Sequence, residues 1–149
     1  MSGGDEATLA AARPALEAVG SKINALGPVG AGATWKLINN QLIATQIASL
    51  AEATNLARKA GFTPDQISSL ILGGSPASPI VQAKLPRMLE RHFEDEDFAL
   101  HLMQDTRYAM DLAMTFGAPA DMTTAAEAAF ARAESKGLGD KDFSAVAAA

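Results

Sequence analysis

The chain has 149 residues, of which 48% are hydrophobic and only 5% aromatic, with no cysteine and a net charge of −5. This length suits one domain, or one domain and a fragment of another. The Ala- and Leu-rich composition favours close helix packing over a sheet, and the acidic charge balance argues against a nucleic-acid partner. Without cysteine or a long apolar run, disulfides, thiolate chemistry and membrane spans are excluded. We therefore expect an all-α, cytoplasmic protein with no membrane partner.

The first 29 residues are expected to form one helix and one strand. Asp5 can cap a helix that ends at Gly20, and Pro14 should kink it. Residues 22–26 alternate between polar and apolar side chains and stop at Gly27-Pro28, which makes them the one plausible strand. This strand has nothing to pair with, so the unit looks like the tail of an α/β domain.

A long helix without a breaker is expected from Trp35 to Ala60. Its apolar residues surround the helix axis, which is typical of a helix that is buried on most sides. About twenty-five residues at ~1.5 Å each give roughly 37 Å, the width of a small domain, so the other elements must pack around this helix. Because its apolar faces are too many for one subunit to cover, we expect a homodimer or a higher homo-oligomer.

Two further helices are predicted after it. Thr63 can cap a short helix that starts at Pro64 and ends at Gly73-Gly74. A polar, proline-stiffened loop then leads into a helix over residues 79–91, in which Pro86 predicts a kink or a break.

The last third of the chain is also expected to be helical. A helix runs from roughly residue 97 to residue 116, and Thr124 and Glu127 form the capping box of the next, which Gly137 closes. Residues 139–140 then start a last short helix. Its docking side chains are Phe143 and Val146.

No metal site is expected. Residues 90–97 hold five acidic side chains in eight, but they lack the Gly turn and the ligand spacing of a calcium loop, so a solvated loop fits better. His92 and His101 have no cysteine or further histidine to complete a zinc site. The methionines fall at helical spacing, which is typical of core side chains.

The start of the long helix carries two glycines and two polar residues. Gly30 and Gly32 let the backbone approach another group closely, and Lys36 and Asn40 project from one face a turn later. Trp35 stands where a dinucleotide fingerprint requires its last glycine. From these residues alone, a snorkelling lysine and an asparagine bonded to a loop are the simpler interpretation.

The pattern Gly30-x-Gly32-x-x-x-Lys36-x-x-x-Asn40 resembles the catalytic signature of the β-hydroxyacid dehydrogenases, the family of 3-hydroxyisobutyrate dehydrogenase and tartronate semialdehyde reductase. Other segments resemble the end of that family's Rossmann domain, its Lys-Asp helix and its C-terminal signature. These segments are residues 3–5 with 26–30, residues 98–113 and residues 137–145. The resemblance covers nearly the whole chain.

The resemblance implies a helical bundle like the C-terminal domain of 6-phosphogluconate dehydrogenase. Residues 30–149 would form this substrate-binding and dimerisation domain, and residues 1–29 would be the remnant of a Rossmann domain. The implied activity is that of an oxidoreductase that moves hydride between NAD or NADP and the carbinol carbon of a small β-hydroxy acid.

The resemblance also implies roles for individual residues. Lys36 would be the general acid/base, and Asn40 would orient that lysine or hold the substrate. Ser78, with Ser75 on the same loop, would line the carboxylate end of the substrate. Gln104 would contact the cofactor, but it stands where the family has a lysine, so a cationic contact is lost.

No phosphate-binding loop occurs in these 149 residues. We therefore expect the cofactor to be bound mainly by a domain outside this chain, and this chain alone to be inactive. The alternative is a non-catalytic helical dimerisation module that derives from the same family.

Overall fold

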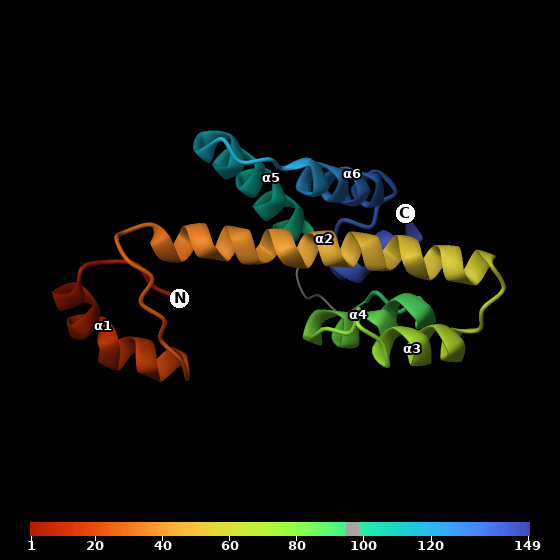
Figure 1. Ribbon diagram of the computed structural model, residues 1–149, viewed down its shortest axis with the longest axis horizontal. Coiled ribbons are helices and arrows are strands. Elements are labelled where there is room, and N and C mark those ends of the chain that lie inside the picture. The colour runs from red at the N-terminus through yellow and green to blue at the C-terminus, as the bar shows by residue number, and fades with distance from the viewer. Residues whose placement is uncertain (95–98) are drawn as a thin grey trace. The chain divides into compact units, whose positions relative to one another are not determined.

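The computed structural model describes residues 1–94 and 99–149 (Figure 1). These residues form six α-helices and one 3₁₀-helix and, apart from one isolated β-bridge, no strand. The prediction of an all-α fold is therefore confirmed. The chain divides into two compact units, Met1–Asn39 and Asn40–Ala149. The predicted division into residues 1–29 and 30–149 stays a prediction.

The helix α1 (Glu6–Val19) lies in the first unit and has the predicted ends. The Asp5 side chain accepts hydrogen bonds from the hydroxyl of Thr8 at 2.7 Å and from its backbone N–H at 2.9 Å. Both bonds favour the charged carboxylate and lower the pKa of Asp5. The helix continues across Pro14 without a break and ends at Gly20.

The segment predicted as an unpaired strand does have a partner. Ser2 pairs with Ala25 in a parallel bridge: the Ser2 N–H donates to the Asn24 carbonyl and the Leu26 N–H to the Ser2 carbonyl, both at 2.9 Å. The expectation of an unpaired strand is therefore wrong. The chain's own first residues satisfy these backbone groups, although the pairing is too short to form a strand.

The long helix α2 (Ala31–Lys59) begins four residues before the predicted start at Trp35. Its buried side chains all fall in its middle and later turns, at Ala44, Ile47, Ala48, Leu50, Ala51 and Thr54. Leu42 and Leu56 are 57% and 70% exposed. Burial on most sides is therefore wrong within this chain, since the other helices cover only part of the α2 surface.

In the second unit, α2 is followed by α3 (Pro64–Leu72) and α4 (Pro79–Glu90). Thr63 caps α3 as predicted, because its hydroxyl accepts from the Gln66 N–H and the Gln66 side chain accepts in return from the Thr63 N–H. α4 runs through Pro86 without a break. These two helices lie together on one side of α2 (Figure 1).

The helices α5 (Ala99–Phe116) and α6 (Asp121–Ser135) pack against each other on another side of α2 (Figure 1). The predicted start of α5 near residue 97 lies outside the described residues. The capping box at Thr124 and Glu127 is wrong. α6 begins three residues before Thr124, and the Thr124 hydroxyl donates to the Ala120 carbonyl at 3.0 Å, as in a helix interior.

The end of the chain forms the 3₁₀-helix η1 (Phe143–Ala148). Gly137 has a φ of 75°, which confirms it as the residue that closes α6. The predicted start at residues 139–140 is wrong, because the capping side chain is that of Asp142. Phe143 and Val146 are buried, so the predicted docking face is confirmed. η1 packs on α4, α5 and α6 and completes the core.

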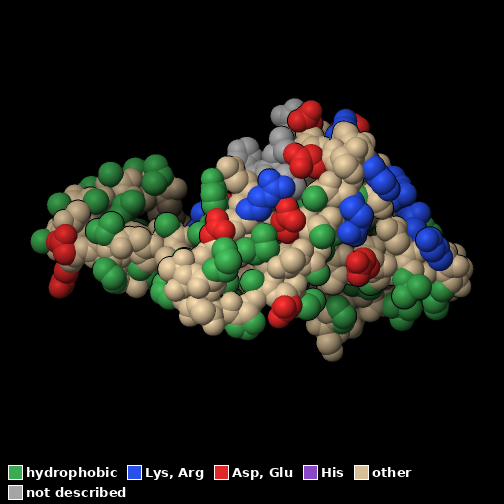
Figure 2. All heavy atoms as spheres, turned by 90° about the horizontal axis from the view of Figure 1, so that it is seen from above, with side chains coloured by type: hydrophobic (Ala, Val, Ile, Leu, Met, Phe, Trp, Pro, Cys, Tyr) green, Lys and Arg blue, Asp and Glu red, His purple; other side chains and the backbone are tan. Residues whose placement is uncertain are grey.

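The exposed surface carries charges of both signs, and Figure 2 shows Lys and Arg side chains beside Asp and Glu side chains on one face. Arg107 pairs with Glu127 at 2.9 Å, and Lys141 with Glu94 at 2.6 Å. Such exposed pairs contribute little to stability. No helix in the described part of the chain is long and apolar enough to cross a bilayer.

One ion pair is buried. The Lys84 ammonium, on α4, donates to the Asp142 carboxylate at 2.5 Å and lies 4.4 Å from the centre of the Phe143 ring. The other Asp142 oxygen accepts from the backbone N–H of Ser144 at 2.9 Å and from its hydroxyl at 2.5 Å. Asp142 is fully buried, so its charge depends on these partners.

Replacing Lys84 with methionine should destabilise the protein strongly, because it leaves the buried Asp142 carboxylate without a cation. We expect the free energy of unfolding to fall by about 3–5 kcal/mol, measured by chemical denaturation. Lys141→Met, which removes the neighbouring exposed pair, is the matched control and should cost less than about 1 kcal/mol. Equal losses in the two variants would contradict this assignment.

Candidate functional site

The glycines at the start of α2 adapt the chain to a close backbone contact within the first unit. A Cβ atom on Gly32 would lie 3.1 Å from the carbonyl carbon of Ser2, and one on Gly3 would lie 2.4 Å from the Pro28 carbonyl oxygen. The close approach expected at Gly32 is therefore present, and the neighbour is the chain's own backbone. Gly30 has open space around it but a φ of 94°, a conformation that glycine adopts without strain.

Lys36 lies on α2 and is exposed. It stands one helical turn before Asn40, so the two side chains project from neighbouring positions on the helix surface. An exposed ammonium on a four-carbon stem can reach a bound small molecule.

Asn40, in contrast, is held in place. Its Nδ2 group donates to Oδ2 of Asp105 on α5 at 2.6 Å, within the second unit. Asp105 is only 9% exposed. The sequence pointed to Asp105 only as the second member of the pair Gln104-Asp105, which corresponds to the family's cofactor-contacting Lys-Asp pair, and not as a partner of Asn40. The bond joins residues 65 positions apart, and no local pattern predicts it.

Gln104 is exposed on α5, next in sequence to Asp105. Its Nε2 group donates to the hydroxyl of Tyr108 at 2.9 Å, one turn further along. An amide nitrogen has two N–H groups, so Gln104 keeps one donor and its carbonyl for another partner. This side chain fits a ribose or amide oxygen, without the charge of a lysine.

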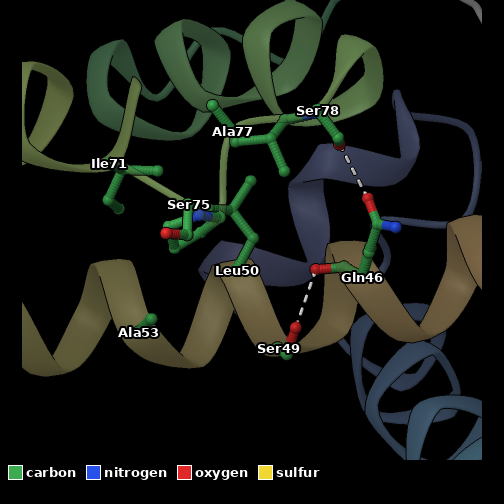
Figure 3. Close-up of a pocket in the computed structure, with 10 residues that line it drawn as sticks. Gln46, Ser49, Leu50, Ala53, Ile71, Ser75, Ala77 and Ser78 are labelled. Carbon is green, nitrogen blue, oxygen red and sulfur yellow. Dashed lines mark hydrogen bonds between the residues drawn. The ribbon is translucent and has the colours of Figure 1, made fainter. Parts of the chain in front are cut away.

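Ser75 and Ser78 line a cleft of about 550 Å³ between α2, α3 and the loop that leads into α4 (Figure 3). The Ser78 hydroxyl donates to Oε1 of Gln46 at 2.8 Å and accepts from the Val81 N–H at 3.3 Å, as the cap of α4. Gln46 therefore belongs to this cleft, and sequence reasoning missed it. No local pattern singles out Gln46, because Gln41, Thr45 and Ser49 are polar residues of the same part of the helix.

The structure thus joins the predicted site residues in two groups within the second unit. Asn40 is bonded to Asp105, the residue that follows Gln104 on α5, whereas the Gln104 side chain bonds to Tyr108. Ser75 and Ser78 line the same cleft. Lys36 belongs to the first unit and is linked to Asn40 by the continuous helix α2. Among the residues that the structure describes, no three His, Asp or Glu side chains gather to hold a metal ion.

Comparison with known proteins identifies the chain's relatives. Residues 30–149 match the family model described as the NAD-binding domain of NADP-dependent 3-hydroxyisobutyrate dehydrogenase. Glyoxylate/succinic semialdehyde reductase 1 of Arabidopsis thaliana is 32% identical over 146 residues, which are 98% of this chain and 50% of the reductase. 2-Hydroxy-3-oxopropionate reductase of Escherichia coli is 31% identical over 147 residues, with the same coverage.

Solved structures agree with these matches. 3-Hydroxyisobutyrate dehydrogenase of Salmonella typhimurium superposes with a TM-score of 0.90 at 26% identity, over 98% of this chain and 52% of that one. The Mycobacterium tuberculosis 3-hydroxyisobutyrate dehydrogenase with L-serine superposes with a TM-score of 0.87 at 32% identity and the same coverage. This chain therefore spans about half the length of these relatives.

The predicted resemblance is confirmed, and so is NAD or NADP as the cofactor of the family, because the matching family model is itself described by NAD binding. The roles of Lys36, Asn40, Ser78 and Gln104 stay predictions. With a family model over residues 30–149 and relatives that align over nearly its whole length, this chain belongs to the β-hydroxyacid dehydrogenase family.

Proposed function

We propose that this chain is the catalytic-lysine and dimerisation domain of an NAD(P)-dependent β-hydroxyacid dehydrogenase. One observation carries the proposal: an accessible Lys36 stands one helical turn before Asn40, whose amide is anchored to the buried Asp105 carboxylate. An accessible amine one turn from an anchored polar group suits proton transfer to and from a small hydroxyl-bearing molecule.

In the oxidation direction, the neutral Lys36 amine accepts the proton of the substrate hydroxyl while the carbinol C–H bond breaks and a carbonyl forms. A nicotinamide bound against Gln104 would supply the acceptor for the hydride that leaves this carbon. In the reverse direction, the Lys36 ammonium donates its proton to the oxygen of the carbonyl.

The other predicted residues bind and orient. Asn40 holds the substrate hydroxyl or the lysine, and Gln104 supplies an uncharged cofactor contact. Ser78 takes part in substrate binding at the carboxylate end, where its hydroxyl is shared with Gln46. The residues present fit a cofactor contact on α5, while the phosphates require a loop that this sequence lacks.

The substrate is proposed to be a small β-hydroxy acid. Among the relatives' names, 2-hydroxy-3-oxopropionate supports this, because its reduction gives an acid with a β-hydroxyl. Glyoxylate and succinic semialdehyde are also short carbonyl acids, although their reduction gives an α- and a γ-hydroxy acid. The Mycobacterium tuberculosis relative was solved with L-serine, itself a β-hydroxy acid. A cytoplasmic location is part of the proposal and is supported by the absence of cysteine.

A non-catalytic dimerisation module is the second candidate, and the exposed face of α2 favours it. Leu42 and Leu56 lie two heptads apart and are both exposed. Residues at this spacing share one face of a helix, with a drift of only ∼20° per heptad. We infer that this face lies against a second copy of the chain, in either candidate function.

The 149 residues alone should bind no dinucleotide with useful affinity, because no glycine-rich loop is present to hold the phosphates. Isothermal calorimetry with NADH and with NADPH tests this expectation. Micromolar binding of either would contradict it and would mean that this domain holds the cofactor by itself.

Catalysis can be tested in a fused reductase, in which this chain replaces the half of the Escherichia coli reductase to which it aligns. We expect turnover of a small carbonyl acid, and we expect Lys36→Ala to lower kcat by ~10²–10⁴, the usual worth of a general acid/base. Lys59→Ala, at the other end of α2, is the matched control and should leave kcat unchanged. A folded fused reductase whose kcat survives Lys36→Ala would rule out the proposed role.

The wild-type chain should have twice its monomer mass of 15.4 kDa in light scattering at micromolar concentration. Leu56→Glu should shift the mass toward the monomer, because it places a charge on the apolar face of α2. Leu70→Glu changes a leucine of similar exposure on α3 and should leave the mass unchanged. A wild-type chain that is monomeric at this concentration would rule out the proposed dimer.

A further inference from the structure

Asp105 is a buried carboxylate to which the proposed mechanism assigns no step. It lies on α5 with 9% of its surface exposed, and its Oδ2 atom accepts from Nδ2 of Asn40 at 2.6 Å. Both residues belong to the second unit, so the bond joins α2 and α5 within one compact body. The donor–acceptor distance is at the short end for such bonds, as expected when the acceptor is charged.

The chemistry of this bond fixes the direction of the Asn40 amide. A carboxylate has acceptors only, whereas an amide has a donor side and an acceptor side of nearly the same shape. Only the nitrogen of Asn40 can therefore face Asp105, since turning the amide over would bring two acceptors together. An asparagine on a surface has no such restriction and samples both orientations.

We propose that Asp105 is a positioning residue that holds the Asn40 amide so that Oδ1 is the atom offered to the reaction. This rests on the proposed function. Oδ1 then accepts a hydrogen bond from a donor, which is the hydroxyl of the substrate or the ammonium of Lys36, one turn earlier on α2. A fixed acceptor of this kind distinguishes a hydroxy acid from an analogue that lacks the hydroxyl group.

A plain structural link between α2 and α5 would make a different demand on residue 105. A hydrogen bond from residue 105 as donor or as acceptor would serve such a link equally well. Its removal would also not be expected to lower kcat more than it raises KM. The positioning role needs an acceptor at this place, and asparagine can provide one through its carbonyl oxygen. Asp105→Asn should therefore preserve the direction of the Asn40 amide, and Asp105→Ala should release it.

The direction of the amide can be measured on the 149-residue chain by NMR, without any cofactor. In the ¹⁵N-labelled protein, with the Asn40 signals assigned through Asn40→Asp, one Hδ2 proton should be shifted downfield and show a nuclear Overhauser effect to the Hβ protons of Asp105. Asp105→Ala should abolish both features, and Asp105→Asn should keep the contact to residue 105. Asp111→Ala, an exposed aspartate on the same helix, is the matched control.

The consequence for catalysis is measured in the fused reductase. Asp105→Ala should lower kcat by roughly 10- to 100-fold, the loss expected for one charge-assisted hydrogen bond, with a smaller change in KM. Asp105→Asn should recover most of this loss, and Asp111→Ala should change nothing. Equal kcat in Asp105→Ala and the wild type, or equal losses in Asp105→Ala and Asp105→Asn, would overturn the positioning role.

The NMR result separates this inference from the proposed function. If the fused reductase folds but does not turn over, the proposed function fails, and the Asn40 signals still decide on the amide. If Asp105→Ala does not fold, the Asn40 signals of the wild-type protein still show whether the amide nitrogen faces Asp105. An Asn40 amide without a downfield Hδ2 proton or a contact to Asp105 would overturn the inference, whatever the activity.

Discussion

The second unit depends on the buried ion pair between Lys84 and Asp142. This pair holds the last turn of the chain, η1, against α4, and η1 also contacts α5 and α6. Because Asp142 is fully buried and also caps η1 through Ser144, its charge and its hydrogen bonds have to be satisfied together. In the described part of the chain, α4 makes no comparable direct contact with α5 or α6, so η1 is the element that connects them. The ion pair therefore ties together the two helix pairs that flank α2.

This arrangement explains why α2 is buried on one part of its surface only. The buried side chains lie between Ala44 and Thr54, where the flanking helices and η1 reach the helix, and they are mostly small or aliphatic. Leu42 and Leu56 lie outside this contact and stay exposed. An exposed leucine alone is ordinary, but exposed positions with heptad spacing on a breaker-free helix form a surface that another helix can cover.

The sequence predicted those features that depend on near neighbours. The caps at Asp5 and Thr63 are bonds to residues three positions away, so their side chains and spacing suffice. At Thr124 the same kind of local pattern failed, because a helix that begins earlier uses the hydroxyl inside its first turns. The pairing of Ser2 with Ala25 and the bond from Asn40 to Asp105 join distant residues, and only the folded chain brings them together. Lys36 and Asn40 were assigned to the site through a family motif, because their side chains and spacing alone favour a snorkelling lysine and an asparagine bonded to a loop.

The proposed roles follow from how firmly each polar side chain is held. Lys36 is exposed at the end of a flexible stem, which suits a group that must accept and return a proton. Asn40 is half-buried, stands on the same helix, and is held by a carboxylate that is itself buried on α5. Burial thus increases from Lys36 through Asn40 to Asp105. In the proposed site, the packed core would set the direction in which the substrate hydroxyl is offered to the base.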